Sequence, residues 1–154
     1  MDRTKTPWVV VTGHRQLYSC AARNAYVADA LEPLLFAHRV DVVVVGHIHV
    51  AQRTCPVLNS TCVSSPDAHG YLAPVHAIVG NAGMTCSTCK GGFLPGGWGS
   101  LEHGFATLTA NATDLTLEFF ADCAKPGPTD QSCRGEDPTL LETYNIHMPF
   151  PRGY

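Results

Sequence analysis

A run of four valines, Val42 to Val45, ends directly in the segment Gly46-His47-Ile48-His49. A short, continuous apolar run of β-branched residues is typical of a strand that is buried on both faces. We predict this strand over Asp41–Gly46. The valine run therefore indicates a layered fold, with two histidines at the end of a buried strand.

A second strand and a helix precede the valine run. Trp8–Thr12 is short, apolar and β-branched, which predicts another buried strand. Asn24–His38 has apolar residues close to helical spacing and begins with a good N-cap residue, Asn24. Pro33 is expected to kink this helix or to mark a second start. Strand, helix and strand in this order predict a βαβ unit with two parallel strands, and so an α/β fold class.

The chain after residue 50 has a less regular pattern. Val75–Val79 is predicted to be a short strand, and Phe105–Thr109 with Leu115–Phe120 an antiparallel β hairpin. Cys55–Gly70 and Thr85–Ser100 are rich in turn-forming residues and are predicted to be loops.

Composition sets the class of protein. The chain has 154 residues, 45% hydrophobic and 15% charged, so it is long enough for one core and too apolar to be disordered. The formal net charge of −3, without a basic stripe, predicts no nucleic-acid partner. No apolar run is long enough to span a bilayer, so no membrane association is expected. Residues 1–122 are assigned to one domain, and residues 123–154 to an irregular tail rich in Cys and Pro.

Seven cysteines and two N-glycosylation acceptors, Asn59 and Asn111, indicate an oxidising, secretory environment. The segment up to Pro7 is polar and is no signal peptide, so we expect the chain to be part of a longer secreted protein.

Six of the cysteines are expected to form three local disulfides. These pairs are Cys55–Cys62, Cys86–Cys89 and Cys123–Cys133. Cys20 is then left over by elimination. Cys86 and Cys89 could instead form half of a zinc site or a redox pair, although the chain has no second C-x-x-C motif.

Three histidines follow the two strands of the βαβ unit: His14 after the first, and His47 and His49 after the second. Parallel strands place such residues at one edge of the sheet, so we expect the imidazoles to converge. In an extended segment His47 and His49 would face one side, and at a bend they could serve two adjacent ions. Imidazole is a common neutral ligand of zinc and iron, which predicts a metal site. The alternative is a set of ordinary loop histidines.

Glycines are expected to help shape this edge of the sheet. Gly13 and Gly46 precede the histidines and would let the backbone turn sharply. Gly80–Gly83 is predicted to be a turn that packs near the same edge. Arg15 is a candidate phosphate contact or a partner in a structural salt bridge.

The chain resembles the C-terminal half of a purple acid phosphatase, within the calcineurin-like metallophosphoesterases. The matching segments are TPWVVVTGHRQLYS, LEPLLFAHRVDVVVVGHIHVAQRTCPV, PVHAIVGNAG and EHGFATLTANATDLTLEFF. The resemblance implies the C-terminal half of a four-layer α/β/β/α sandwich that hydrolyses phosphate monoesters. It also implies a dinuclear centre of Fe(III) with Zn, Mn or Fe(II). His14 and His47 would bind the divalent ion, and His49 the ferric ion.

Three further ligand motifs of that family, G-D-x-G, G-D-x-x-Y and G-N-H-E, do not occur in this chain. One or two imidazoles hold a catalytic ion poorly, so we expect this chain alone to bind metal weakly and to lack activity. It is also expected to expose apolar surface and an open sheet edge. Two other hypotheses are a non-catalytic, secreted, disulfide-stapled binding module and a small structural zinc protein built on Cys86, Cys89 and histidines. No residue pattern indicates an oligomeric state.

Overall fold

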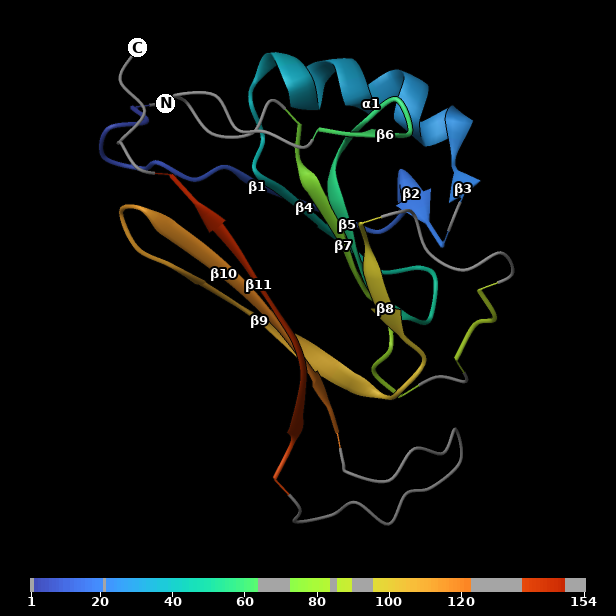
Figure 1. The fold of residues 1–154 in the computed structure, drawn as a ribbon. Coiled ribbons are helices and arrows are strands. Elements are labelled where there is room, and N and C mark those ends of the chain that lie inside the picture. The colour runs from blue at the N-terminus through green and yellow to red at the C-terminus, as the bar shows by residue number, and fades with distance from the viewer. Residues whose placement is uncertain are drawn as a thin grey trace.

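The fold has three layers (Figure 1). The computed structural model describes residues 2–20, 22–63, 73–83, 86–89, 96–122 and 137–148. Helix α1 (Ala25–Ala37) covers one face of a six-stranded sheet, and a three-stranded sheet lies against the other face. The predicted α/β class is confirmed.

The six-stranded sheet contains the βαβ unit. Its strands are β1 (Val10–Gly13), β4 (Val42–Val45), β5 (Ala51–Leu58), β6 (Thr61–Cys62), β7 (Val75–Val79) and β8 (Trp98–Ser100). The spatial order is β1-β4-β7-β5-β6, and β8 pairs with β5. Strands β1, β4 and β7 are parallel, whereas β5 is antiparallel to β7. The predicted parallel pair of strands around α1 is therefore confirmed.

The second sheet is antiparallel. Its strands are β9 (Gly104–Ala110), β10 (Asp114–Ala121) and β11 (Thr139–His147), in the order β11-β10-β9. The hairpin predicted from alternating residues corresponds to β9 and β10. A separate two-stranded ladder joins β2 (Tyr18–Ser19) to β3 (Ala22–Arg23).

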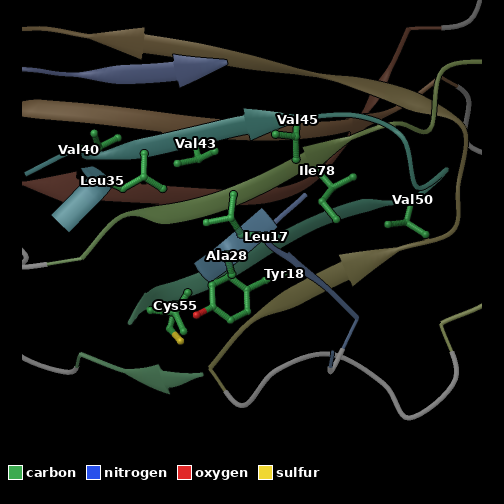
Figure 2. Close-up of a cluster of buried hydrophobic side chains, with 11 residues drawn as sticks. Leu17, Tyr18, Ala28, Leu35, Val40, Val43, Val45, Val50, Cys55 and Ile78 are labelled. Carbon is green, nitrogen blue, oxygen red and sulfur yellow. The ribbon is translucent and has the colours of Figure 1, made fainter. Parts of the chain in front are cut away.

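The valine run forms two cores at once. Val43 and Val45 face the helix side, where Figure 2 shows them gathered with Leu35 and other buried side chains. Val42 faces the opposite side and packs with Leu115 of the second sheet. Successive side chains of a strand point to opposite faces, so an all-valine strand contributes to both layers. Each such buried valine stabilises the fold by roughly 1.5–3 kcal/mol.

Helix α1 starts after Asn24, as predicted, but the Asn24 side chain does not cap it. Its amide instead donates to the carbonyl oxygen of Gln16, at 3.3 Å. The helix continues through Pro33, which therefore does not mark a second start. No helix in the described part of the chain has the length and apolar character needed to cross a bilayer.

The loop predictions are wrong at three strands. Strands β5 and β6 lie partly within the expected loop Cys55–Gly70, and β8 ends the expected loop Thr85–Ser100. β5 was missed because it contains buried polar residues, including Gln52 and Thr54, and it lacks an apolar alternation. Strands such as these gain their order from neighbouring strands. Residues 64–72 of the expected loop lie outside the described part.

The expected irregular tail is also wrong for Thr139–His147, which form β11 along β10. Only Ile146 of this strand is fully buried. The strand therefore lacks the clear alternation of apolar and polar residues that would predict it from the sequence. Residues 123–136 and 149–154 lie outside the described part. The boundary at residue 122 stays a prediction.

Within the described residues, the six-stranded sheet has an open edge and apolar side chains are exposed, as expected. β1 is the first strand of the six-stranded order, and Val10 is 38% exposed. A groove of about 450 Å³ runs between this strand and the helix, and its apolar lining includes Val9, Val11, Leu31 and Leu34.

Candidate metal centre

The carboxyl ends of β1 and β4 bring His14 and His47 together. Gly13 lies opposite Val45 in the parallel register, so the segments that follow leave the sheet side by side. Nε2 of His14 lies 3.1 Å from Nδ1 of His47, and the rings meet edge to face with centroids 5.0 Å apart. The predicted convergence of these two imidazoles is confirmed, while their binding of a metal ion stays a prediction.

The segment from Gly46 to Val50 is bent rather than extended. The backbone N–H of Ile48 donates to the carbonyl oxygen of Gly46 at 2.8 Å. The backbone N–H of Val50 donates to the carbonyl oxygen of Ile48 at 2.9 Å. His47 and His49 therefore do not lie in an extended segment, and the alternative of a bend matches the structure.

The sharp turn falls on His47 itself, which has a φ of 67°. Gly46 has no positive φ, and a Cβ atom there would meet nothing within 4 Å. The expectation that Gly46 lets the backbone turn sharply is therefore wrong, because the turn is made by His47. A positive φ is uncommon in residues other than glycine, although histidine adopts it more often than most, and such strain is found preferentially at functional sites.

Gly80 holds the histidine segment against the end of β7. Its amide donates to the carbonyl oxygen of Val50 at 3.2 Å. A Cβ atom on Gly80 would lie 2.1 Å from the carbonyl oxygen of Ile48, so no other residue fits without displacing that segment. The turn that begins at Gly80 therefore packs near this edge, as predicted.

Ser87 fixes the position of His49 and was not found by sequence reasoning. The His49 amide donates to the Ser87 hydroxyl at 3.1 Å, and the Ser87 amide donates to the His49 carbonyl at 2.9 Å. A serine in a Gly- and Cys-rich loop gives no sequence signal for this contact, because the pairing depends on two segments 38 residues apart.

A disulfide holds the Ser87 loop in place, and it corrects one expected pairing. Cys89 is bonded to Cys20, not to Cys86, which is a free thiol. The zinc hypothesis that uses both Cys86 and Cys89 is therefore also wrong. Proximity in sequence suggested the local pair, but the fold places the end of the β2 region beside the loop, 69 residues further along.

The other cysteines follow expectation as far as the structure extends. Cys55 and Cys62 form the predicted disulfide across the turn between β5 and β6. Cys123 and Cys133 lie outside the described residues.

The electrostatics of the site favour a neutral His47. Partial burial lowers the pKa of its imidazole below the usual value, and the charges of Arg15, His14 and His49 lower it further. Nη1 of Arg15 lies 3.3 Å from Nε2 of His47. Histidine binds metal ions in its neutral form, so this environment is compatible with a ligand role.

The residues present fit part of a metal site. His14 and His47 are close enough to share one ion, and His49 is near enough to influence the pKa of His47. In the described part of the chain, no group of three or more His, Cys, Asp or Glu side chains is arranged to hold a metal ion. Catalytic zinc sites use three protein ligands, so these imidazoles would need ligands from other segments.

Comparison with known proteins identifies the family. Residues 2–51 match the family model of the calcineurin-like phosphoesterases, and residues 73–127 match that of the iron/zinc purple acid phosphatase-like protein C. The chain belongs to the purple acid phosphatase family. All three candidate histidines lie within the first matched segment.

Several purple acid phosphatases and other acid phosphatases resemble the chain. An acid phosphatase of Aspergillus ficuum is 36% identical over an alignment 169 residues long, gaps included. The alignment covers 97% of this chain and 25% of that protein. The probable inactive purple acid phosphatase 9 of Arabidopsis thaliana is 38% identical over 141 residues, 77% of this chain and 20% of that protein. A purple acid phosphatase from yellow lupin seeds has the same fold, with a TM-score of 0.70, 25% identity and coverage of 96% and 26%. The chain thus spans about a quarter or less of the length of each of these relatives.

Proposed function

We propose that this chain is the C-terminal part of a phosphatase that hydrolyses phosphate monoesters at a dinuclear metal centre. The observation that supports this most is the 3.1 Å approach of the His14 and His47 imidazoles at the carboxyl edge of the parallel strands. The family resemblance adds the metals, Fe(III) with Zn, Mn or Fe(II). A pair of bound ions supplies a hydroxide nucleophile and holds the phosphate group.

The chain's own residues have distinct tasks in this proposal. His14 and His47 would hold the divalent ion, and His49, fixed through Ser87, would hold the ferric ion. Arg15 would contact the phosphate group of the substrate. Its side chain is exposed beside His47 and forms no salt bridge within the described residues, which leaves the guanidinium available for a phosphate.

The isolated chain is proposed to be inactive. Its donor set at this edge consists of imidazoles, whereas the carboxylate, amide and tyrosine ligands of the family lie in motifs that the chain lacks. Too few ligands remain to hold two ions, so metal binding should be weak.

The test is a metal and activity measurement on two forms of the protein. The longest native form, purified from its source, should contain two metal ions and hydrolyse a generic aryl phosphate. His14→Ala should lower the content of the divalent ion and abolish hydrolysis, whereas His38→Ala, which changes an exposed histidine at the end of α1, should change neither. The residues 1–154 alone should show no turnover above their own His14→Ala variant. A native form without metal, or turnover by the isolated chain above that control, would contradict the proposal.

A non-catalytic secreted module is the second candidate. It is favoured by two disulfides in a chain with an incomplete donor set, and by the relatives that are named probable inactive. Disulfides persist mainly in oxidising compartments, which supports secretion. A metal-free native protein that is folded and glycosylated would favour this candidate.

A further inference from the structure

A hollow of about 290 Å³ lies between helix α1 and the turn that joins β5 to β6. Its lining includes Arg23, Asp29, Pro33, Phe36, Leu58 and Asn59. One of these residues, Asn59, is the acceptor of the sequon Asn59-Ser60-Thr61 and is exposed. A glycan attached there would start at the wall of the hollow.

The turn that carries Asn59 is held firmly against the helix (Figure 1). The backbone N–H of Asn59 donates to the buried Glu32 carboxylate at 2.8 Å, and the backbone N–H of Ser60 donates to the Tyr18 hydroxyl at 3.0 Å. Asn59 and Ser60 both have positive φ values, 46° and 62°, as in the tight turns that join hairpin strands. The Cys55–Cys62 disulfide closes the same hairpin. The attachment point is therefore fixed relative to α1.

The chemistry of the hollow suits the first sugar of an N-linked glycan. Phe36 is 41% exposed there, and Pro33 adds an aliphatic surface. Arg23 and Asp29 form an ion pair of 2.8 Å at the polar side. A pyranose has an apolar C–H face that packs on an aromatic ring, and hydroxyl and acetamido groups that bond to charged side chains.

We propose that Asn59 is N-glycosylated and that its first N-acetylglucosamine occupies this hollow, packed on Phe36 and Pro33. The bond forms between Nδ2 of Asn59 and the anomeric carbon of a lipid-diphosphate-linked oligosaccharide. The lipid diphosphate leaves, and the amide loses one proton. The seated sugar covers apolar surface of α1 and ties the hairpin to the helix, independently of the metal centre.

The first test measures covering of Phe36 directly. The protein is produced through a eukaryotic secretory pathway, and intact mass establishes the glycan at Asn59. Hydroxyl-radical labelling of Phe36 is then compared in the intact glycoprotein, after trimming by an endoglycosidase that leaves one N-acetylglucosamine, and after complete removal of the glycan. Labelling should be low in the first two forms and rise roughly twofold in the third, because a seated pyranose covers one face of the ring.

Each other outcome contradicts the proposal. An unmodified Asn59, equal labelling in all three forms, or a rise already after trimming would each overturn the placement of the first sugar.

A second measurement uses stability and does not depend on labelling. Thr61→Ala removes the sequon but keeps Asn59, which tolerates its positive φ better than a replacement would. Phe36→Ala should lower the unfolding midpoint more in the glycosylated protein than in the Thr61→Ala background. Leu34→Ala, which changes an exposed α1 residue that lines the other groove, should have the same effect in both backgrounds. Equal effects of Phe36→Ala in the two backgrounds would contradict the proposal.

Discussion

Single residues control the shape of the histidine segment through their backbone conformation and packing. His47 takes the positive φ, and Gly80 lets β7 approach the backbone of Ile48. Buried polar residues act at the same scale. His76 in β7 is fully buried beside the Tyr18 ring, and neither of its ring nitrogens has a hydrogen-bond partner within the described residues. Both features come from close packing, so each can be tested by one substitution.

Gly80→Ala should displace the histidine segment. The added Cβ would lie 2.1 Å from the Ile48 carbonyl oxygen, so the backbone must shift. We expect the free energy of unfolding to fall by about 1–3 kcal/mol, as for overpacking elsewhere, together with weaker metal binding in the full protein. Chemical denaturation and metal content measure the two effects. Gly46→Ala is the matched control, since its Cβ meets nothing within 4 Å. An unchanged Gly80→Ala protein would contradict the close packing.

His76 should make the fold less stable in acid. Burial lowers the pKa of its imidazole to about 4, whereas in the unfolded chain the pKa is close to the usual value of 6.5. Between these values the unfolded state binds a proton that the folded state does not, so stability falls as the pH drops. The loss should approach about 3 kcal/mol at pH 4. Burial raises the pKa of Asp41 to about 6, which acts in the opposite direction.

The measurement compares urea unfolding of the wild type and His76→Phe at several pH values from 7 to 4. The contribution of Asp41 is common to both proteins and cancels in the difference. The wild type should lose stability relative to the variant as the pH falls through this range. A constant difference between the two curves would show that His76 is not the titrating group.

At the scale of elements, the site depends on how loops are fastened to strands. The loop at residues 86–89 reaches His49 through Ser87 and reaches the end of the β2 region through Cys20–Cys89. Cys20 is itself tied to β5, because its amide donates to the Gln52 side chain at 2.6 Å. This disulfide therefore connects parts of the fold that are distant in sequence, whereas Cys55–Cys62 closes a single hairpin.

Removing the two disulfides should have different effects. By the loop-entropy relation, loss of Cys20–Cys89, with a separation of 69 residues, should cost about 4 kcal/mol, and loss of Cys55–Cys62, with a separation of 7, about 2 kcal/mol. Paired Cys→Ser variants and denaturant unfolding measure this. Hydrogen exchange at the His49 amide should become faster only when Cys20–Cys89 is removed. Equal exchange in both variants would mean that the disulfide does not hold the histidine segment.

At the scale of the whole molecule, three layers share two interfaces. The helix and one face of the large sheet form the first core, and the other face packs against the second sheet. Strand β11 belongs to that second sheet although it follows the segment 123–136, which lies outside the described part. Ile146 contributes to the core formed with Val42 and Leu115. Strand β11 thus packs with the rest of the fold, and the domain boundary at residue 122 stays a prediction.

Substitutions in β11 test whether this strand is part of the cooperative unit. Ile146 is 3% exposed, so Ile146→Ala should lower the free energy of unfolding by about 2–5 kcal/mol. Leu140, at the start of the same strand, is 50% exposed, and Leu140→Ala should cost less than about 1 kcal/mol. Denaturant unfolding of both variants provides the comparison. If Ile146→Ala matched its exposed control, β11 would not belong to the folded core.

Sequence by itself determined the features that depend on local pattern. The valine run, the helical spacing before it and the alternation of β9 and β10 predicted a βαβ unit and a hairpin, because burial imposes a period on each element. Parallel strands also bring the ends of neighbouring strands together, so the meeting of His14 and His47 followed from the topology. The amino-acid sequence around these histidines was enough to indicate the family.

Only the tertiary structure decided the features that join distant segments. The Cys20–Cys89 bond, the Ser87 contact with His49 and the pairing of β11 with β10 link residues that leave no periodic signal in the sequence. Strand β5 was hidden because buried polar side chains break the apolar pattern, and its hydrogen-bonding partners β7 and β8 supply the order. The turn on His47 likewise follows from the packing of Gly80 against Ile48, a contact between segments that the chain brings together only when it folds.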